Sequence, residues 1–187
     1  MASLGLVGGC TADSPEPVDP SVSVPEVTAT PSPTPTPTTP PEAVRPVEPE
    51  AMSSPGTEGA AAAAEYFFSL LTYASATGDL EAIQGIRHPE CIFCASSVED
   101  VTGEKEAGLS TVGGAISTDV TRSTQISEEF FSIELTVQSE PSQTVDGAGT
   151  VVESFEAGSG TAVVVVLGAP GRWVVRGVEL TRSGSVS

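Results

Sequence analysis

The amino-acid sequence predicts an α+β domain that follows a long proline-rich segment. Three observations predict this class. Thirteen of the 16 prolines lie between residues 15 and 55, the chain after them begins with helical periodicity, and its second half has the alternation of strands. Helices followed by antiparallel strands, without alternation of the two, are typical of α+β domains. We therefore expect a single domain over 56–182 and a flexible tail over 183–187.

The segment over 11–55 is predicted to be a disordered linker rich in proline, serine and threonine. Proline has no backbone N–H and a fixed φ, so neither a helix nor a sheet ladder can run through repeated prolines. The segment also has no aromatic residue, and ordering it would cost conformational entropy without burying apolar surface. We expect a semi-rigid, polyproline-like spacer, whose Ser/Thr–Pro repeats also suit O-glycosylation.

The first predicted helix begins near Thr57 and ends before Gly78. Its alanine-rich start favours a helix, and its apolar residues recur at helical spacing along one face. Gly78 can adopt the left-handed conformation that often ends a helix. The apolar residues of this face are Ala63, Phe67, Leu70, Leu71 and Ala74.

Two further helices are predicted before the strands. A short helix over 80–86 can be capped by Asp79. The third helix is expected to begin near Ser96 or Ser97, because Ser97 and Asp100 have the spacing of a capping box.

The second half of the domain is predicted to be an antiparallel meander. Residues 131–138 alternate strictly between apolar and polar side chains, which indicates a strand with one exposed face. Residues 161–168 are β-branched on both faces and should lie in the centre of the sheet. The turn over 168–171 predicts a hairpin to a strand over 172–180. Weaker strand candidates cover 112–126 and 150–155, with a loop over 142–149.

The charge of the chain limits its partners. The sequence has 25 acidic and 7 basic residues, a net charge of −18. Nucleic-acid binding and adsorption to anionic lipid both require clustered Lys and Arg, so the composition argues against both. The sequence has no apolar stretch of about 18 residues that could span a membrane as a helix. We expect partners to be neutral or cationic.

The residues Val7, Gly8, Gly9 and Cys10 resemble the lipobox of bacterial lipoproteins. In that motif small residues precede a cysteine whose thiolate takes up diacylglycerol. The resemblance implies a lipid anchor on Cys10, with the domain tethered on the extracytoplasmic side of the cell membrane. Residues 1–10 lack the basic residues and apolar core of a full signal peptide, so we interpret them as a signal remnant. If no start codon lies further upstream, Cys10 has no such role.

Cys91 and Cys94 are the remaining cysteines, and lipidation of Cys10 would leave them free to pair. A structural disulfide is the preferred interpretation, with a redox pair, free thiols and metal ligands as alternatives. His88 and Glu90 add fragments of a zinc-deaminase signature, but residues this close cannot converge on one ion while the glutamate acts as base. We expect no metal site and no cofactor.

The segment over 66–94 is similar to a family of actinobacterial lipoproteins of unknown function. The shared pattern is Y-A-x-A-T-G-D followed by D/H-P-x-C-x-x-C, and a looser resemblance continues to Leu180. The resemblance implies helices packed against a curved antiparallel sheet, a cone of the nuclear-transport-factor-2-like or SnoaL-like kind. It implies no reaction.

The preferred functional hypothesis is a non-catalytic domain that binds a cell-envelope protein or a neutral or cationic small ligand. The alternative is a small-molecule enzyme, such as an isomerase, dehydratase or hydrolase, that uses the pocket of the cone. Such an enzyme could also use Glu153 or His88. No catalytic residue is assigned. The candidate pocket residues are Tyr66, Tyr73, Glu134 and Trp173.

Overall fold

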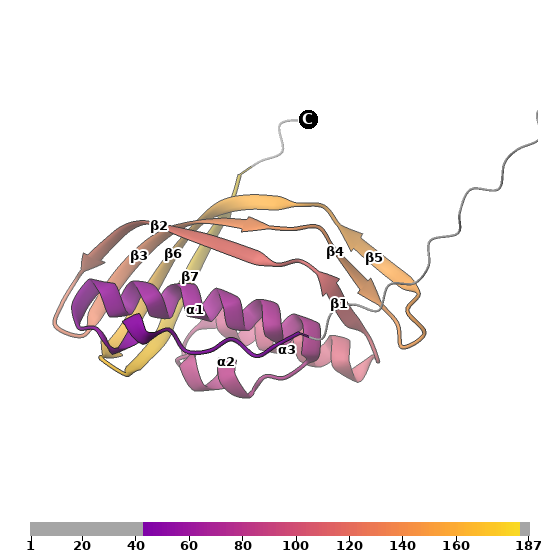
Figure 1. Cartoon of the computed structure of the whole chain (residues 1–187), viewed down its shortest axis with the longest axis horizontal. Coiled ribbons are helices and arrows are strands. Elements are labelled where there is room, and N and C mark those ends of the chain that lie inside the picture. The colour runs from indigo at the N-terminus through magenta and orange to yellow at the C-terminus, as the bar shows by residue number, and fades with distance from the viewer. Residues whose placement is uncertain (1–42, 184–187) are drawn as a thin grey trace, which may run out of the picture. The chain divides into compact units, whose positions relative to one another are not determined.

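The helices precede the strands, as the sequence predicts for an α+β domain (Figure 1). The computed structural model describes residues 43–183, so the lipobox residues Val7–Cys10 and most of the predicted linker lie outside the described residues. The helical elements are η1 (Glu50–Ser53), α1 (Gly56–Thr77), α2 (Glu81–Ile86) and α3 (Ile92–Glu106). The strands are β1 (Ser110–Gly113), β2 (Ile116–Gln125), β3 (Phe130–Ser139), β4 (Ser142–Val145), β5 (Val151–Phe155), β6 (Gly158–Ala169) and β7 (Arg172–Arg182).

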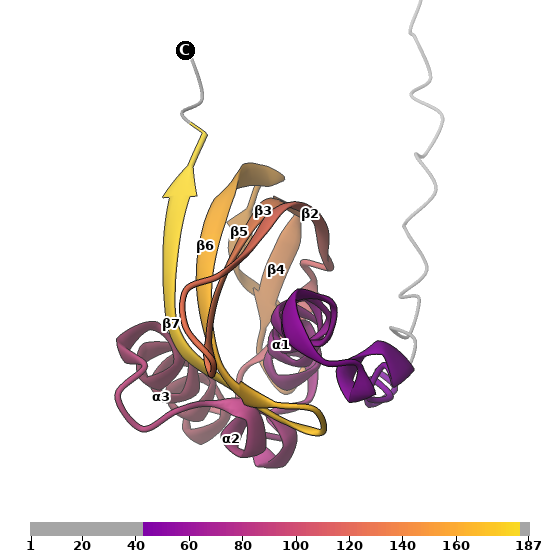
Figure 2. The same cartoon turned by 90° about the vertical axis from the view of Figure 1, so that its left-hand side faces the viewer.

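The strands form two antiparallel sheets. The larger has the order β2-β3-β6-β7 and the smaller the order β1-β4-β5. The β3–β6 pair continues, across short interruptions at 140–141 and 156–157, into the β4–β5 hairpin, which bends away from the large sheet (Figure 1). Figure 2 shows the large sheet curving around the side on which α1 lies. The concave face of this sheet therefore holds the core.

Helix α1 forms as the sequence predicts, and all five apolar residues of its predicted face are at most 8% exposed. The helix ends at Gly78, which has φ 71° and ψ 9° and donates its N–H to the Ala74 carbonyl. A left-handed C-cap of this kind suits glycine, because glycine has no Cβ to clash. The prediction for this helix and its end is confirmed.

Helix α3 begins earlier than predicted, at Ile92 and not near Ser96 or Ser97. Cys91 is its N-cap, and the Cys91 sulfur accepts the Cys94 N–H at 3.2 Å. Ser97 instead donates its hydroxyl to the Phe93 carbonyl one turn back. A sulfur acceptor replaces the serine cap here, which is why the serine pattern gave the wrong start.

The strong strand predictions are confirmed, and one loop prediction is wrong. Phe131, Ile133, Leu135 and Val137 are buried on one face of β3, and β6 has a partner on each side. The weak candidate over 112–126 is two strands, separated where Gly113 and Gly114 have positive φ. Residues 142–145 are strand β4, although a loop was expected over 142–149. Their polar sequence has little strand signal, and pairing with β1 and β5 makes them a strand.

Part of the predicted linker belongs to the folded domain. Met52 in η1 is only 4% exposed and lies in the hydrophobic core, so the domain begins before residue 55. One apolar side chain in a proline-rich stretch is too weak a signal for sequence reasoning to find. None of the helices in residues 43–183 is long and apolar enough to cross a membrane.

Candidate functional site

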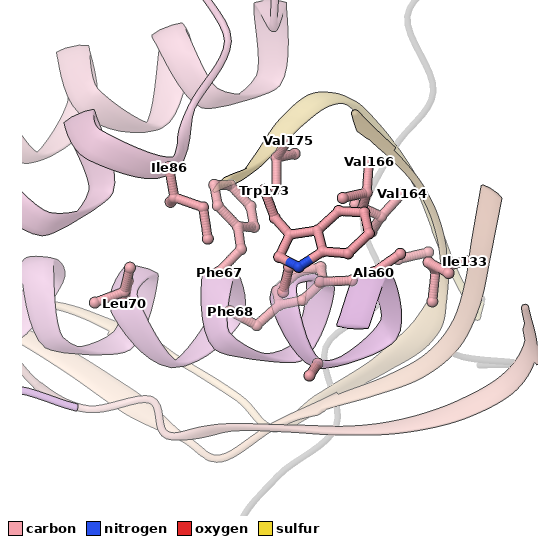
Figure 3. Close-up of a cluster of buried hydrophobic side chains, with 14 of the residues drawn as sticks. Ala60, Phe67, Phe68, Leu70, Ile86, Ile133, Val164, Val166, Trp173 and Val175 are labelled. Atoms are coloured by element: carbon pink, nitrogen blue, oxygen red, sulfur yellow. The ribbon is translucent and has the colours of Figure 1, made fainter. Parts of the chain in front are cut away.

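Trp173 lies in the core and not on an open pocket wall (Figure 3). Its side chain is 4% exposed, and its ring meets Phe131 edge to face with centroids 5.3 Å apart. Its indole N–H donates to the Met52 carbonyl at 2.7 Å. A buried indole needs such a partner, and Met52 satisfies it. Trp173 therefore packs in the core and does not line an open pocket, although it was expected as a pocket residue.

Tyr66 and Tyr73 both lie on α1, and each makes a local hydrogen bond. The Tyr66 hydroxyl donates to the Pro46 carbonyl at 3.4 Å, and burial, with the Glu48 charge, raises the pKa of Tyr66. The Tyr73 hydroxyl donates to Asp79 at 3.0 Å, and this hydrogen bond is the main reason that the pKa of Tyr73 is raised. Both hydroxyl groups hold neighbouring chain segments in place.

Glu134 lies on the outer face of β3, whereas its neighbours Ile133 and Leu135 point into the core. Its carboxylate is 3.8 Å from the Arg122 guanidinium, and both side chains are largely exposed. The structure therefore does not bring Glu134 together with Tyr66, Tyr73 and Trp173. Alternation along a strand sends Glu134 to the face opposite the core.

The turn that contains His88 is attached to strand β7. The His88 N–H donates to the Val175 carbonyl at 2.9 Å, and the His88 ring accepts the Glu90 N–H at 3.2 Å. The Glu90 carboxylate pairs with Arg176 at 2.7 Å. These contacts join the α2–α3 turn to the sheet edge and give the histidine a structural role.

Cys91 and Cys94 form a disulfide at the start of α3, as the sequence predicts. Their Cα atoms are 5.2 Å apart, and the two residues are 1% and 0% exposed. Buried sulfurs are shielded from an attacking thiolate, so this geometry favours a structural bond over redox exchange. Because the two sulfurs are bonded to each other, neither is a thiolate that could bind a metal ion. No group of three or more His, Cys, Asp or Glu within residues 43–183 could hold a metal ion.

A groove of about 900 Å³ is a candidate site on the described part of the domain. Helices α1 and α3, strands β2 and β3, the β5–β6 connection and the end of β7 surround it. Its volume falls within the range of small-molecule sites. The apolar lining residues are Phe68, Leu71, Phe93, Ile116, Val137, Phe155, Ala157 and Leu180; the others are Ser139, Ser154, Glu156, Gly158, Ser159, Gly160, Arg182 and Ser183.

The groove exists because the concave face is not filled along its whole length. Large side chains fill the end near Trp173, whereas the wall formed by 157–160 has the sequence Ala-Gly-Ser-Gly. These small residues leave space opposite Phe68 and Phe93. The run of small residues at the start of β6 is the sequence signal that could have indicated this site. None of the four candidate pocket residues lines it.

The architecture defines the protein as an α+β domain with helices on one face of a curved antiparallel sheet and an apolar groove at one end. The chain belongs to the family of unknown function DUF6318, which matches residues 33–179. No curated protein sequence matches the chain.

Two solved structures are similar to parts of the chain at low sequence identity. The crystal structure of the intermembrane space region of the chloroplast protein ARC6 has a TM-score of 0.56 and 11% identity, covering 68% of this chain and 97% of that one. A structure from Catenulispora acidiphila has a TM-score of 0.39 and 14% identity, covering 65% and 89%. The first likeness concerns the fold alone.

Proposed function

We propose that the protein is a non-catalytic binding domain, tethered to the extracytoplasmic face of the cell membrane, and that the groove is its ligand site. The groove carries this proposal, because it combines a large volume with a mostly apolar lining. Burying apolar ligand surface against such a wall is favourable by about 25 cal/mol per Å².

The chemistry of the lining favours binding over reaction. The residues that line the groove in the described part of the chain include no histidine, cysteine, aspartate or tyrosine. Glu156 and Arg182 are the charged members, and serine hydroxyls are the other polar side chains. General acid–base or nucleophilic catalysis needs a positioned pair of reactive groups. Hydroxyls around an apolar floor instead suit orientation of a bound molecule.

The net charge of −18 indicates which ligands can approach the groove. The excess of negative charge repels anions, so the ligand is neutral or cationic. The apolar side chains of the groove favour an apolar ligand. Glu156 on the groove wall can pair with a cationic group.

The proposal includes a nuclear-transport-factor-2-like fold. Support comes from the four-stranded antiparallel sheet, its curvature, and the helices on its concave side (Figure 2). It also includes lipidation at Cys10, for which the support is the lipobox-like sequence Val7–Cys10 alone. A diacylated cysteine holds a protein stably at a membrane, and the proline-rich segment would space the groove from the lipid surface.

Titration with Nile red, a neutral apolar dye, tests the groove. We expect saturable binding that Leu180→Asp weakens by about tenfold or more, because a carboxylate in an apolar wall must be desolvated. Val163→Asp is the matched control, since Val163 is 37% exposed on the outer face of β6 and Leu180 is 39% exposed. Equal loss of dye binding in both variants, or no saturation in the natural chain, contradicts the groove as the site.

Lipidation is tested by placing a complete lipoprotein signal sequence ahead of Val7 in a bacterial host. We expect the protein in the membrane fraction with incorporated palmitate, and Cys10→Ser in the soluble fraction. The Cys91→Ala/Cys94→Ala variant serves as control and should stay with the membrane. A Cys10→Ser protein that remains in the membrane fraction overturns the anchor.

A further inference from the structure

We propose that the free edge of strand β5 binds an extended, basic segment of another protein by strand addition. This inference goes beyond the groove, because it uses the backbone edge of the small sheet. Strand addition supplies main-chain hydrogen bonds, and the side chains of the two strands decide which segments fit.

Strand β5 pairs with β4 and with no other strand in residues 43–183. All five of its residues are exposed. Its large apolar side chains are among the most exposed of the sheets: Val151 at 46%, Val152 at 54% and Phe155 at 48%. Unpaired N–H and C=O groups beside exposed apolar side chains are a template for another strand.

The other sheet edges are each protected against pairing with a further strand. Strand β2 has a register irregularity beside Arg122, and β7 carries three arginines along its length. Strand β1 packs on helix α1. Bulges, charged side chains and covering helices are the usual means by which edges avoid pairing. Strand β5, with the sequence Val-Val-Glu-Ser-Phe, has a bulge at Val152, where its register with β4 shifts. It has neither a basic residue nor a proline, and all five of its residues are exposed.

The charge around β5 specifies a basic partner. Residues 140–157, which include β4, β5 and the segments beside them, contain no lysine or arginine and four acidic residues. Among the residues that line the groove, the basic one is Arg182, at the end of β7. Opposite charges on facing strands attract and like charges repel. The four acidic residues are Glu140, Asp146, Glu153 and Glu156.

The same charges argue against a second copy of this chain as the partner. Pairing of two β5 edges would bring Glu153 of each copy onto one small sheet, with Glu156 next to it. The preferred segment therefore alternates basic residues with apolar ones. The basic residues face the acidic groups, and the apolar ones cover Val151 or Val152.

The test uses the full chain and a short fluorescent peptide in which lysine alternates with valine, followed by anisotropy. We expect saturable binding at about 50 mM salt that weakens at about 500 mM, where charges are screened. A matched peptide with glutamate in place of lysine should bind about tenfold more weakly or not at all. Glu153→Lys should weaken binding, and Glu128→Lys, at the distant β2–β3 turn, should leave it unchanged.

N-methylation of the peptide separates strand addition from simple charge attraction. Only alternate N–H groups of an added strand face the sheet, so methylating one alternate set should abolish binding and methylating the other should not. Leu180→Asp should retain peptide binding even where it loses Nile red, so the two proposals fail separately. Equal effects of both methylated sets, equal binding of the glutamate peptide, or a dimer that Val152→Lys disrupts would each overturn the proposal.

Discussion

The indole N–H of Trp173 donates to the backbone carbonyl of Met52 at 2.7 Å, across 121 residues of sequence. The contact joins the last strand to the segment before the first helix. Both residues are 4% exposed, so the hydrogen bond is made inside the core. It also explains why the folded domain includes residues that composition assigns to the linker.

Trp173→Phe should lower the free energy of unfolding by about 1–3 kcal/mol. The Met52 carbonyl loses the indole N–H and keeps only the Gly171 N–H at 3.1 Å, and the smaller ring leaves part of the core unfilled. Chemical denaturation monitored by circular dichroism measures the loss. Val174→Ala, a neighbouring change on the less buried face of β7, is the control for shortening a side chain in this strand. Unchanged stability in Trp173→Phe would show that the hydrogen bond makes no net contribution.

Met52→Ala should cost about 2–5 kcal/mol, the usual range for truncating a buried methionine. A chain that begins at residue 43 retains η1 and should unfold close to the full chain. A chain that begins at residue 55 lacks Met52 and should melt markedly lower. Similar melting temperatures for the two shortened chains would contradict a structural role for residues 43–54.

Gly59→Ala should destabilise the domain although alanine favours helices. A Cβ at position 59 would lie 2.8 Å from Cζ2 of Trp173 and closer still to the Ser54 carbonyl oxygen, so the backbone must shift. Overpacking of this kind costs about 1–3 kcal/mol. Gly103→Ala in α3 is the matched control, because its Cβ meets nothing within 4 Å.

The expected gain for Gly103→Ala is about 0.5–1 kcal/mol, the difference in helix propensity. Thermal unfolding of the two variants should therefore show shifts of opposite sign. Two stabilised variants would mean that Gly59 is not needed for the approach of Trp173 to α1.

The disulfide should contribute about 2 kcal/mol, since the loop that it closes is very short and the entropic effect grows with loop length. Cys91→Ala/Cys94→Ala should fold and melt lower. In unlipidated protein that is unfolded without reductant, thiol counting should find Cys10 alone, and Cys10→Ser should have no reactive thiol. Three reactive thiols per natural chain would refute the disulfide.

Asp79 should make the stability of the domain depend on acid pH. Its carboxylate accepts the Glu81 N–H and the Tyr73 hydroxyl, each at 3.0 Å, and these bonds lower its pKa from the usual 3.8. A carboxyl whose folded pKa is depressed stabilises the fold above its unfolded pKa, and this contribution is lost as pH falls through the folded value.

The corresponding experiment is urea unfolding of Asp79→Asn and the natural chain at about pH 7 and about pH 3. We expect the variant to be less stable near neutrality and the difference to shrink in acid. Tyr73→Phe should show a smaller part of the same effect, because it removes only the second hydrogen bond. A difference that stays constant with pH would argue against the charge of Asp79 as the cause.

Local patterns were sufficient to predict most of the fold. The apolar stripe of α1, the Gly78 cap and the alternation in β3 depend on neighbours in sequence, and all three are confirmed. Strand β4 depends on partners far along the chain, and its Ser-Gln-Thr-Val sequence carries no clear period. The position of Met52 in the core likewise depends on Trp173, which lies far along the chain.

The candidate site was harder to predict for a related reason. Tyr66 and Tyr73 are pocket candidates because of their residue type alone. In the structure their hydroxyls donate hydrogen bonds to the Pro46 carbonyl and the Asp79 carboxylate. The groove instead depends on the curvature of the sheet and on the absence of large side chains at 157–160. Sequence patterns point to residues with large or reactive side chains. Here the space exists because the residues at one end of the sheet are small.

The segment over 43–55 also determines how the domain would bear mechanical load. A pull on the chain ahead of residue 43 reaches the domain first through the Arg45–Glu81 ion pair and the Tyr66–Pro46 hydrogen bond, at 3.7 and 3.4 Å. Behind these weaker contacts, Met52 is held in the core and by Trp173. Tension would therefore break these two outer contacts before it reached α1 and the sheet. The two contacts would re-form when the tension is released, and the groove would stay intact throughout.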